Sequence, residues 1–508
     1  MHPFLVLMLW SIFLLSQEPM APLKATSPLA TQIHSLIEQI LLQYHRPVSA
    51  ETLYLAVCVR MYTLAGQPVP RSLRDEVRQA CAANAGPDQR RLLLAAVQQR
   101  TLDRLPFVPQ LPLVALADAL TAELDPYSGL VTAKEMRRAA QQDSDTYGIG
   151  VEWQEESPEG TWKVQSVALG SPAQRAGLRP GDWLLRVNGQ PVSKTTPLVR
   201  EALQPQSAEQ IPQLLGEEPQ EAVAQRQPQR LELELRRGEG PSRRVTLQPE
   251  RHRPEVVLGT RRLMGNRWSF WLDEKDRLAY IRLGQLRRGA AEELHEQLRT
   301  LKLCGVQGLI LDLRWAPGGY LNEAVEVADL FLGDRVLATV RMRQRDDTVY
   351  RGNDSPIFDN LPVVLLVNGD TQGGAELIAA ALQDHGRAIV VGQRTRGKAT
   401  IQTPLGLGHE QFSFKVTSGI FVRPSGKNLH RHPGSGPRDD WGVRPEVDCR
   451  VSPELSSKLR EEWLLWSLRP VEESVRLALD DPTYDMQKNE AWKVLRQRVT
   501  QADPKNKK

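Results

Sequence analysis

The stretch LILDLRWAPGG, residues 309–319, places an apolar run directly before a glycine-rich turn. A short, nearly continuous apolar run bounded by turn signals is typical of a strand that is buried on both faces, as in a parallel sheet. A helix is predicted to follow from Leu321 to about Leu332. Together these elements predict one strand–loop–helix unit of an α/β domain.

A second unit repeats this plan along the chain. The run PVVLLVN, residues 362–368, predicts a strand, Gly369 to Gly374 predicts a loop, and Ala375 to Asp384 predicts a helix. Loops at the carboxyl ends of such strands are where α/β folds place their chemistry. Glycine-rich turns there can present free N–H groups to an oxyanion. Gly318 and Gly374 are therefore candidate oxyanion donors.

Bulk composition excludes several classes of protein. A chain of 508 residues is long enough for about three domains. Its 65 lysines and arginines against 61 acidic residues give a net charge of +4, and the basic pairs are scattered, which argues against nucleic-acid binding. The four cysteines form no CxxC pair, so no metal site and no cofactor is predicted. Cys58 and Cys81 could pair in an oxidising compartment or stay as free thiols.

The first residues differ from the rest of the chain. Residues 3–15 form an almost uninterrupted apolar run that is too short for a bilayer-spanning helix, which needs about 20 residues. Its length suits a secretory signal or an uncleaved anchor within residues 1–25. We therefore expect export to the periplasm, the cell envelope or the medium, with membrane contact only through this segment. Helical periodicity then predicts a helical domain over residues 26–145.

A strand-rich block is predicted over residues 146–250. It contains SPAQRAGL at 171–178, GDWLLRVNG at 181–189, and an irregular Gln- and Pro-rich insertion over 204–230. This block closely resembles a PDZ domain, a β-sandwich or barrel-like module. The resemblance implies that a glycine-flanked loop binds a peptide carboxylate through backbone N–H groups, unless the domain only packs internally. The residues of that loop are Tyr147, Gly148, Ile149, Gly150 and Val151.

The C-terminal half resembles the C-terminal processing (tail-specific) serine proteases. The resemblance begins at DPYS, 125–128, and ends at GVRPEV, 442–447. Its most specific pieces are DLR…PGG at 312–319, AELIAAALQD at 375–384, TRGK at 395–398 and RPSG at 423–426. It implies a multidomain α+β protein: an α/β protease core of the ClpP/crotonase-like kind over residues 251–450 and a helical tail over 451–508.

The resemblance also implies a catalytic dyad. Family members use a serine nucleophile and a lysine that takes its proton, with a glutamine four residues after the lysine to help position it. Lys398 and Gln402 match that lysine and that glutamine. The family serine lies 25 residues before the lysine, and that residue is Gly373. No serine lies between Asn368 and Glu376, so the dyad lacks its nucleophile.

Three functions are compatible with this pattern. The first is a catalytically degenerate protease that captures protein or peptide C-termini through its PDZ domain and vacant channel. The second is an active peptidase that uses Thr371, the only nearby hydroxyl, or another hydroxyl together with Lys398. The third is a structural partner that forms hetero-oligomers with an active relative, and homo-oligomers are also compatible with the sequence.

Overall fold

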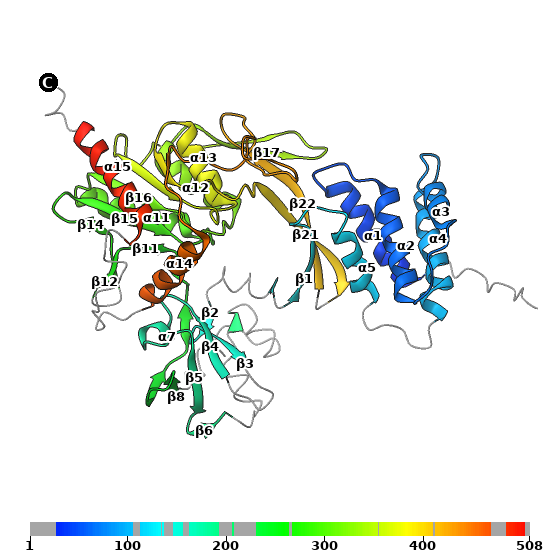
Figure 1. The fold of residues 1–508 in the computed structure, drawn as a ribbon, viewed down its shortest axis with the longest axis horizontal. Helices are drawn as coiled ribbons and strands as arrows, with labels where there is room; N and C mark the ends of the chain where they lie inside the picture. The colour runs from blue at the N-terminus through cyan, green and yellow to red at the C-terminus, as the bar shows by residue number, and fades with distance from the viewer. Residues whose placement is uncertain are drawn as a thin grey trace, which may run out of the picture. The chain divides into compact units, whose positions relative to one another are not determined.

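A computed structural model describes most of the chain (Figure 1). The described residues are 27–104, 112–133, 135–136, 146–155, 162–192, 206–207, 230–263, 267–353, 355–409, 412–468 and 484–502. They divide into two compact units. The first comprises 1–136, 342–345 and 401–419, and the second comprises 137–341, 346–400 and 420–508. The predicted signal or anchor segment, residues 1–25, falls outside the described residues.

The first unit is built on a bundle of short helices. They are α1 (Pro28–Gln43), α2 (Ala50–Leu64), α3 (Leu73–Ala80), α4 (Pro87–Arg100), the short 3₁₀ helix η1 (Leu102–Arg104) and α5 (Pro112–Thr121). Pro28 stands in the first turn of α1 and the Ser27 hydroxyl accepts from the Ala30 N–H, so sequence fixes where this helix begins.

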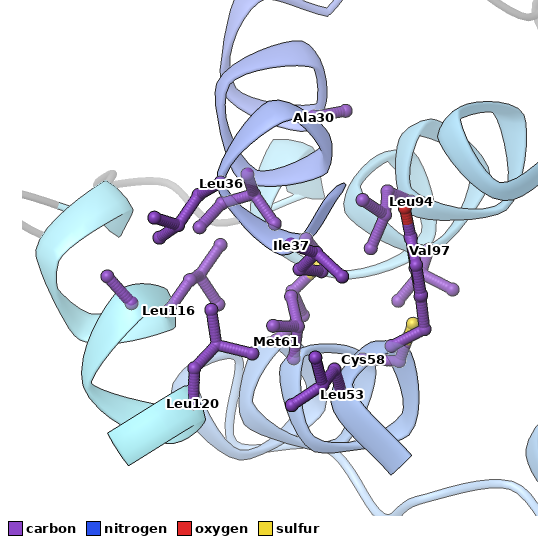
Figure 2. Packing of buried hydrophobic residues seen from close by; sticks show 14 of the residues in the cluster. Ala30, Leu36, Ile37, Leu53, Cys58, Met61, Leu94, Val97, Leu116 and Leu120 are labelled. Atoms are coloured by element: carbon purple, nitrogen blue, oxygen red, sulfur yellow. The ribbon is translucent and has the colours of Figure 1, made fainter. Parts of the chain in front are cut away.

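Apolar side chains from these helices form one core, shown in Figure 2. Ile37, Leu53 and Met61 are fully buried there. Cys58 lies in the same core, where burial raises the pKa of its thiol to about 12. Cys58 and Cys81 are both free thiols in the structure, so the alternative of a disulfide between them is not realised.

Strands complete the first unit. β1 (Gly129–Thr132) pairs antiparallel with residues 412–415 of β22 (Phe412–Val422), and β21 (Thr400–His409) pairs with β22. The prediction of a purely helical segment up to residue 145 misses β1. Its four residues are too few to show a period, and their strand conformation depends on pairing with residues almost 300 positions later.

The PDZ region forms a twisted antiparallel sheet of order β3-β4-β5-β8-β9, with β6 beside β5. Its members are β3 (Val151–Glu155), β4 (Trp162–Val167), β5 (Asp182–Val187), β6 (Gln190–Pro191), β8 (Leu231–Arg237) and β9 (Ser242–Leu247), with the short helix α7 (Pro172–Arg175). Alternate residues of β8, Leu231, Leu233 and Leu235, are buried as their period predicts. A separate small sheet joins β2 (Thr146–Gly148) to β7 (Gln206–Ser207) and β10 (Glu250–His252).

A mixed, mainly parallel sheet lies at the centre of the second unit. It runs β11-β15-β16-β19-β20-β23, with β14 beside β15, and β15, β16, β19, β20 and β23 are parallel. The strands are β11 (Val257–Leu258), β14 (Trp271–Asp273), β15 (Leu278–Leu283), β16 (Gly308–Asp312), β19 (Val363–Val367), β20 (Ile389–Gly392) and β23 (Val447–Asp448). Hairpins β12 (Arg261–Leu263) with β13 (Arg267–Ser269), and β17 (Val336–Met342) with β18 (Thr348–Arg351), lie outside this sheet.

Both predicted strand–loop–helix units are confirmed. β16 is followed by α12 (Leu321–Leu332) and β19 by α13 (Gly374–Asp384), and α11 (Ala290–Leu303) connects β15 to β16. The chain then continues through α14 (Pro453–Ser467) and α15 (Met486–Ala502). α15 covers one face of the sheet, where Leu495 packs with Ile310 and Val364. That the core is of the ClpP/crotonase-like kind remains a prediction.

A buried charge cluster connects α15 to the sheet. Asp312, at the end of β16, accepts from the Tyr280 hydroxyl at 2.6 Å and from Arg314, whose guanidinium also donates to Asp485 at 2.8 Å. Burial alone would raise the pKa of Asp312, but the charges of Arg314 and Arg282 lower it to about 2. The cluster therefore fixes the loop after β16 from two sides.

Two negative findings hold for the described residues. None of their helices combines the length and apolarity needed to cross a bilayer. None of their His, Cys, Asp and Glu side chains gather in threes or more as a metal site would require.

Candidate active site at the carboxyl ends of β16 and β19

Two loops meet where β16 and β19 end, at the edge predicted to carry the chemistry. The Asn368 side-chain oxygen accepts from the N–H groups of Trp315, at 3.0 Å, and Thr371, at 3.1 Å. The Gln372 N–H donates across to the Ala316 carbonyl at 3.1 Å. One asparagine thus holds the loop after β16 against the loop after β19.

The candidate oxyanion donors Gly318 and Gly374 lie within this junction. A Cβ atom on Gly318, whose φ is 85°, would lie 2.8 Å from the Gln372 carbonyl oxygen and 3.0 Å from the Gly374 nitrogen. Only glycine fits there. Within the described chain, the N–H groups of Gly318 and Gly374 donate to no acceptor. Both N–H groups therefore lie in one junction, and their role as oxyanion donors stays a prediction.

Gly373 occupies the turn into α13. Its φ of 62° lies in the left-handed region, which glycine adopts without steric cost. A Cβ atom at this position would lie 3.5 Å from the Gly318 Cα and 3.7 Å from the Pro317 carbonyl oxygen, which are ordinary van der Waals distances. The site therefore has room for a small side chain beside the two free N–H groups, although such a side chain would carry backbone strain.

Glu376, in the first turn of α13, joins the two halves of the predicted dyad. Its side chain is fully buried, and its Oε2 accepts from the N–H of Gly373 at 3.2 Å and from the N–H of Lys398 at 2.8 Å. Its Oε1 accepts from the Gly397 N–H at 2.6 Å and from the Thr395 hydroxyl. One carboxylate therefore brings the backbone of position 373 next to the backbone of the lysine.

The electrostatics of Glu376 are a balance of opposing effects. Burial raises the pKa of this carboxyl to about 7, and the four donors only partly oppose that rise because they favour the charged form. Sequence analysis did not single out Glu376 or Thr395. A glutamate at the third position of the helix, within the otherwise apolar run AELIAAAL, is the signal that could have found it.

The lysine and the glutamine of the predicted site lie in different units. Lys398, in the second unit, is half-buried and sits in the loop between β20 and β21. Gln402, in the first unit, lies in β21, and its side-chain amide donates to the Thr417 hydroxyl at 3.1 Å. The structure therefore gives Gln402 a contact with β22.

Thr371, the alternative nucleophile, makes structural hydrogen bonds within its own turn. Its hydroxyl is fully buried, donates to the Leu313 carbonyl at 2.9 Å and accepts from the Asn368 N–H at 3.0 Å. A hydroxyl in that position closes the turn after β19 and would have to leave both partners to reach a substrate.

The predicted carboxylate-binding loop of the PDZ domain lies between β2 and β3. Ile149 and Val151 are buried, and the N–H groups of Ile149 and Gly150 donate to no described residue. Gly150 is tightly enclosed, because a Cβ atom there would lie 2.2 Å from the Ser171 Cβ. Tyr147 and Gly148 pair with β10. Most of the predicted Gln- and Pro-rich insertion lies outside the described residues.

Comparisons with known proteins agree with this arrangement. Residues 277–448 match the model of peptidase family S41, and residues 163–214 match a PDZ domain model. A carboxy-terminal-processing protease of Bartonella bacilliformis is 27% identical over 413 residues, which cover 76% of this chain and 83% of that protein.

Two further matches are a curated relative and a solved structure. A probable CtpA-like serine protease of Staphylococcus haemolyticus is 27% identical over 349 residues, 68% of this chain but only 61% of that protein. Among solved structures, a photosystem II D1 C-terminal processing protease matches 85% of this chain and 95% of its own, with 20% identity and a TM-score of 0.43. The chain therefore contains a peptidase family S41 domain with a PDZ domain before it, and it is similar to C-terminal-processing proteases.

Proposed function

We propose that this chain is a catalytically degenerate member of its family that binds C-terminal peptide segments without cleaving them. The observation that carries the proposal is the glycine at position 373. Its backbone N–H and that of Lys398 share one Glu376 oxygen, yet position 373 has no side chain to act as a nucleophile. Loss of the nucleophile in a well-studied serine protease costs about 10⁶ in turnover.

The remaining site supports binding rather than a substitute chemistry. Free N–H groups at Gly318 and Gly374 can still donate to a peptide carbonyl oxygen, whereas the Thr371 hydroxyl is committed to Leu313 and Asn368. Backbone N–H groups of Ile149 and Gly150 give the PDZ loop donors for a terminal carboxylate. By this reasoning peptides are held at two places in the second unit.

A cleavage assay tests the degenerate site. Wild type, Gly373→Ser, Gly373→Ser/Lys398→Ala and Lys398→Ala are incubated with an unfolded protein that has an apolar C-terminus. We expect no cleavage by wild type, cleavage by Gly373→Ser, and none by the double variant. Wild-type cleavage that is lost in Lys398→Ala would overturn the proposal in favour of another hydroxyl.

Inactivity of Gly373→Ser needs a separate control, because serine at a φ of 62° and a ψ of −129° costs about 1–3 kcal/mol. Gly373→Ala carries the same backbone cost without a hydroxyl. Equal denaturation midpoints for Gly373→Ser and Gly373→Ala would show that the serine hydroxyl adds no further loss of stability. If Gly373→Ser then still fails to cleave, the retained Lys398 cannot support the dyad.

A second assay tests binding directly. Fluorescent peptides with a free carboxylate are titrated with wild type, and the same peptides with an amidated terminus serve as the comparison. Saturable binding that weakens on amidation is expected from the PDZ loop. Equal binding of both forms would contradict terminal-carboxylate capture.

A further inference from the structure

A pocket of about 740 Å³ lies beside the loops that carry Gly373 and Lys398. It opens at the carboxyl ends of β19 and β20, and all the residues that line it belong to the second unit. We call it the arginine pocket, because the residues that matter to its chemistry are Asp370, Arg394, Arg431, Trp441 and Arg444.

A stack of the Trp441 ring with two arginine guanidinium groups forms one wall. The Arg394 guanidinium carbon lies 3.5 Å from the centroid of the Trp441 ring, and that of Arg431 lies 4.6 Å from it. This stack touches the lysine loop directly, since the Arg431 N–H donates to the Gly397 carbonyl at 2.8 Å. A Cβ atom on Gly397 would lie 2.7 Å from the Arg431 Cβ, so the stack requires glycine immediately before Lys398.

Four arginines line the pocket, and the three other than Arg450 are held differently. Arg394 donates to backbone carbonyls of Trp441 and Pro437, and Arg444 uses one terminal nitrogen on carbonyls of the same loop. Arg431 is exposed, and apart from the Trp441 ring its guanidinium has no acceptor among the described residues. Arg394 and Arg444 therefore shape the wall, and Arg431 has donors to offer.

The pocket carries excess positive charge. Its acidic residues are already paired, Asp370 with Arg396 at 2.5 Å and Asp448 with Arg450 at 2.8 Å. Burial, together with the charges of Arg444 and Arg431, lowers the pKa of Arg394 to about 10. An anion bound here would relieve that mutual repulsion.

We propose that the arginine pocket binds a carboxylate of the peptide that lies along the Lys398 loop, supplied by an Asp or Glu side chain or by the chain terminus. The inference rests on the proposed peptide-binding function and adds a preference for acidic segments. A guanidinium matches a carboxylate in geometry and donates two parallel hydrogen bonds to it, and Arg431 has those donors free.

The test uses the full chain and three labelled peptides of one length and one parent sequence. One has an internal Glu and an amidated terminus, one has Gln in its place and a free terminus, and one has Gln and an amidated terminus. Affinities are measured by fluorescence anisotropy for wild type and Arg431→Gln. Arg438→Gln, an exposed arginine of the same loop that does not line the pocket, removes the same charge as the matched control.

We expect Arg431→Gln to weaken binding of at least one carboxylate-bearing peptide about tenfold and to leave the fully neutral peptide unchanged. Loss with the internal Glu identifies a side-chain carboxylate, and loss with the free terminus identifies a terminal one. Equal effects of Arg431→Gln and Arg438→Gln, or no effect on any peptide, would overturn the inference. If no peptide binds wild type, the neutral one included, the proposed function fails and the inference fails with it.

Discussion

The buried carboxyl of Glu376 makes the stability of this fold depend on pH in an unusual direction. Its pKa is about 7 in the folded chain and 4.5 in an unfolded reference, because burial disfavours the charge. The folded state therefore binds this proton more tightly than the unfolded state does. Its contribution to stability is fully present below pH 4.5 and is lost as pH rises through 7.

These two values fix the size of the effect. Between pH 5 and pH 8, the preferential protonation of Glu376 in the folded state is worth about 2.5 kcal/mol of unfolding free energy. Most paired carboxylates act in the opposite sense, since their partners lower the pKa and acid destabilises them. Glu376 accepts hydrogen bonds from Gly373, Thr395, Gly397 and Lys398 but has no basic side chain as a partner in them.

Glu376→Gln removes the titration while keeping the shape of the side chain. Turning the amide oxygen toward the N–H groups of Gly373 and Lys398 leaves the amide NH₂ facing the Gly397 N–H, which becomes a buried donor without an acceptor. That costs about 1–3 kcal/mol at every pH. On top of this constant loss, the stability difference between pH 5 and pH 8 should shrink by about 2.5 kcal/mol relative to wild type.

Urea denaturation at pH 5 and pH 8, followed by tryptophan fluorescence, measures both terms. Glu292→Gln, at an exposed position of α11, is the matched control and should keep the wild-type pH dependence. If the unfolding free energy of Glu376→Gln changes between pH 5 and pH 8 by as much as that of wild type, the reasoning is refuted. Some other group would then carry the pH dependence.

Two further substitutions test contacts that hold the second unit together. Gly319→Ala would place a Cβ atom 2.1 Å from the Leu286 carbonyl oxygen, so it should lower the unfolding free energy measured in urea by about 3 kcal/mol or more. The control is Gly386→Ala, at a φ of 63° with open space around it, which should cost about 1 kcal/mol. Asp182→Asn removes the charge of a buried carboxylate that pairs with the half-exposed Arg237 at 2.7 Å. It should lower the stability of the PDZ domain by about 2–3 kcal/mol in thermal denaturation, and an unchanged melting temperature would show that this pair adds nothing.

The sequence could predict what depends on local pattern. The run PVVLLVN predicts β19 because apolar residues without interruption suit a strand with both faces covered, and the structure buries every residue of β19. Gly373 follows from the resemblance to the C-terminal processing proteases, whose serine lies 25 residues before the lysine. Gly318 and Gly374 follow from glycine-rich turns after strands, since the carboxyl ends of parallel strands meet at one edge.

Contacts between distant residues could not be read in this way. Glu376 meets Lys398 across 22 positions, and Arg314 meets Asp485 across 171. Each of these side chains, taken alone, looks like a solvated charge on a helix or loop. Their burial depends on how α13 and α15 pack on the sheet, and no local period carries that information.

The contacts around position 373 show that the architecture of this site does not depend on the side chain at that position. The hydrogen bonds that position Gly373 come from its backbone: its N–H donates to Glu376, and its carbonyl accepts from the N–H groups of Glu376 and Leu377. None of them needs a side chain at 373. Chemistry and scaffold are therefore separable here, so binding of peptides and the Glu376 pH dependence should both persist in Gly373→Ser, and cleavage alone should be gained.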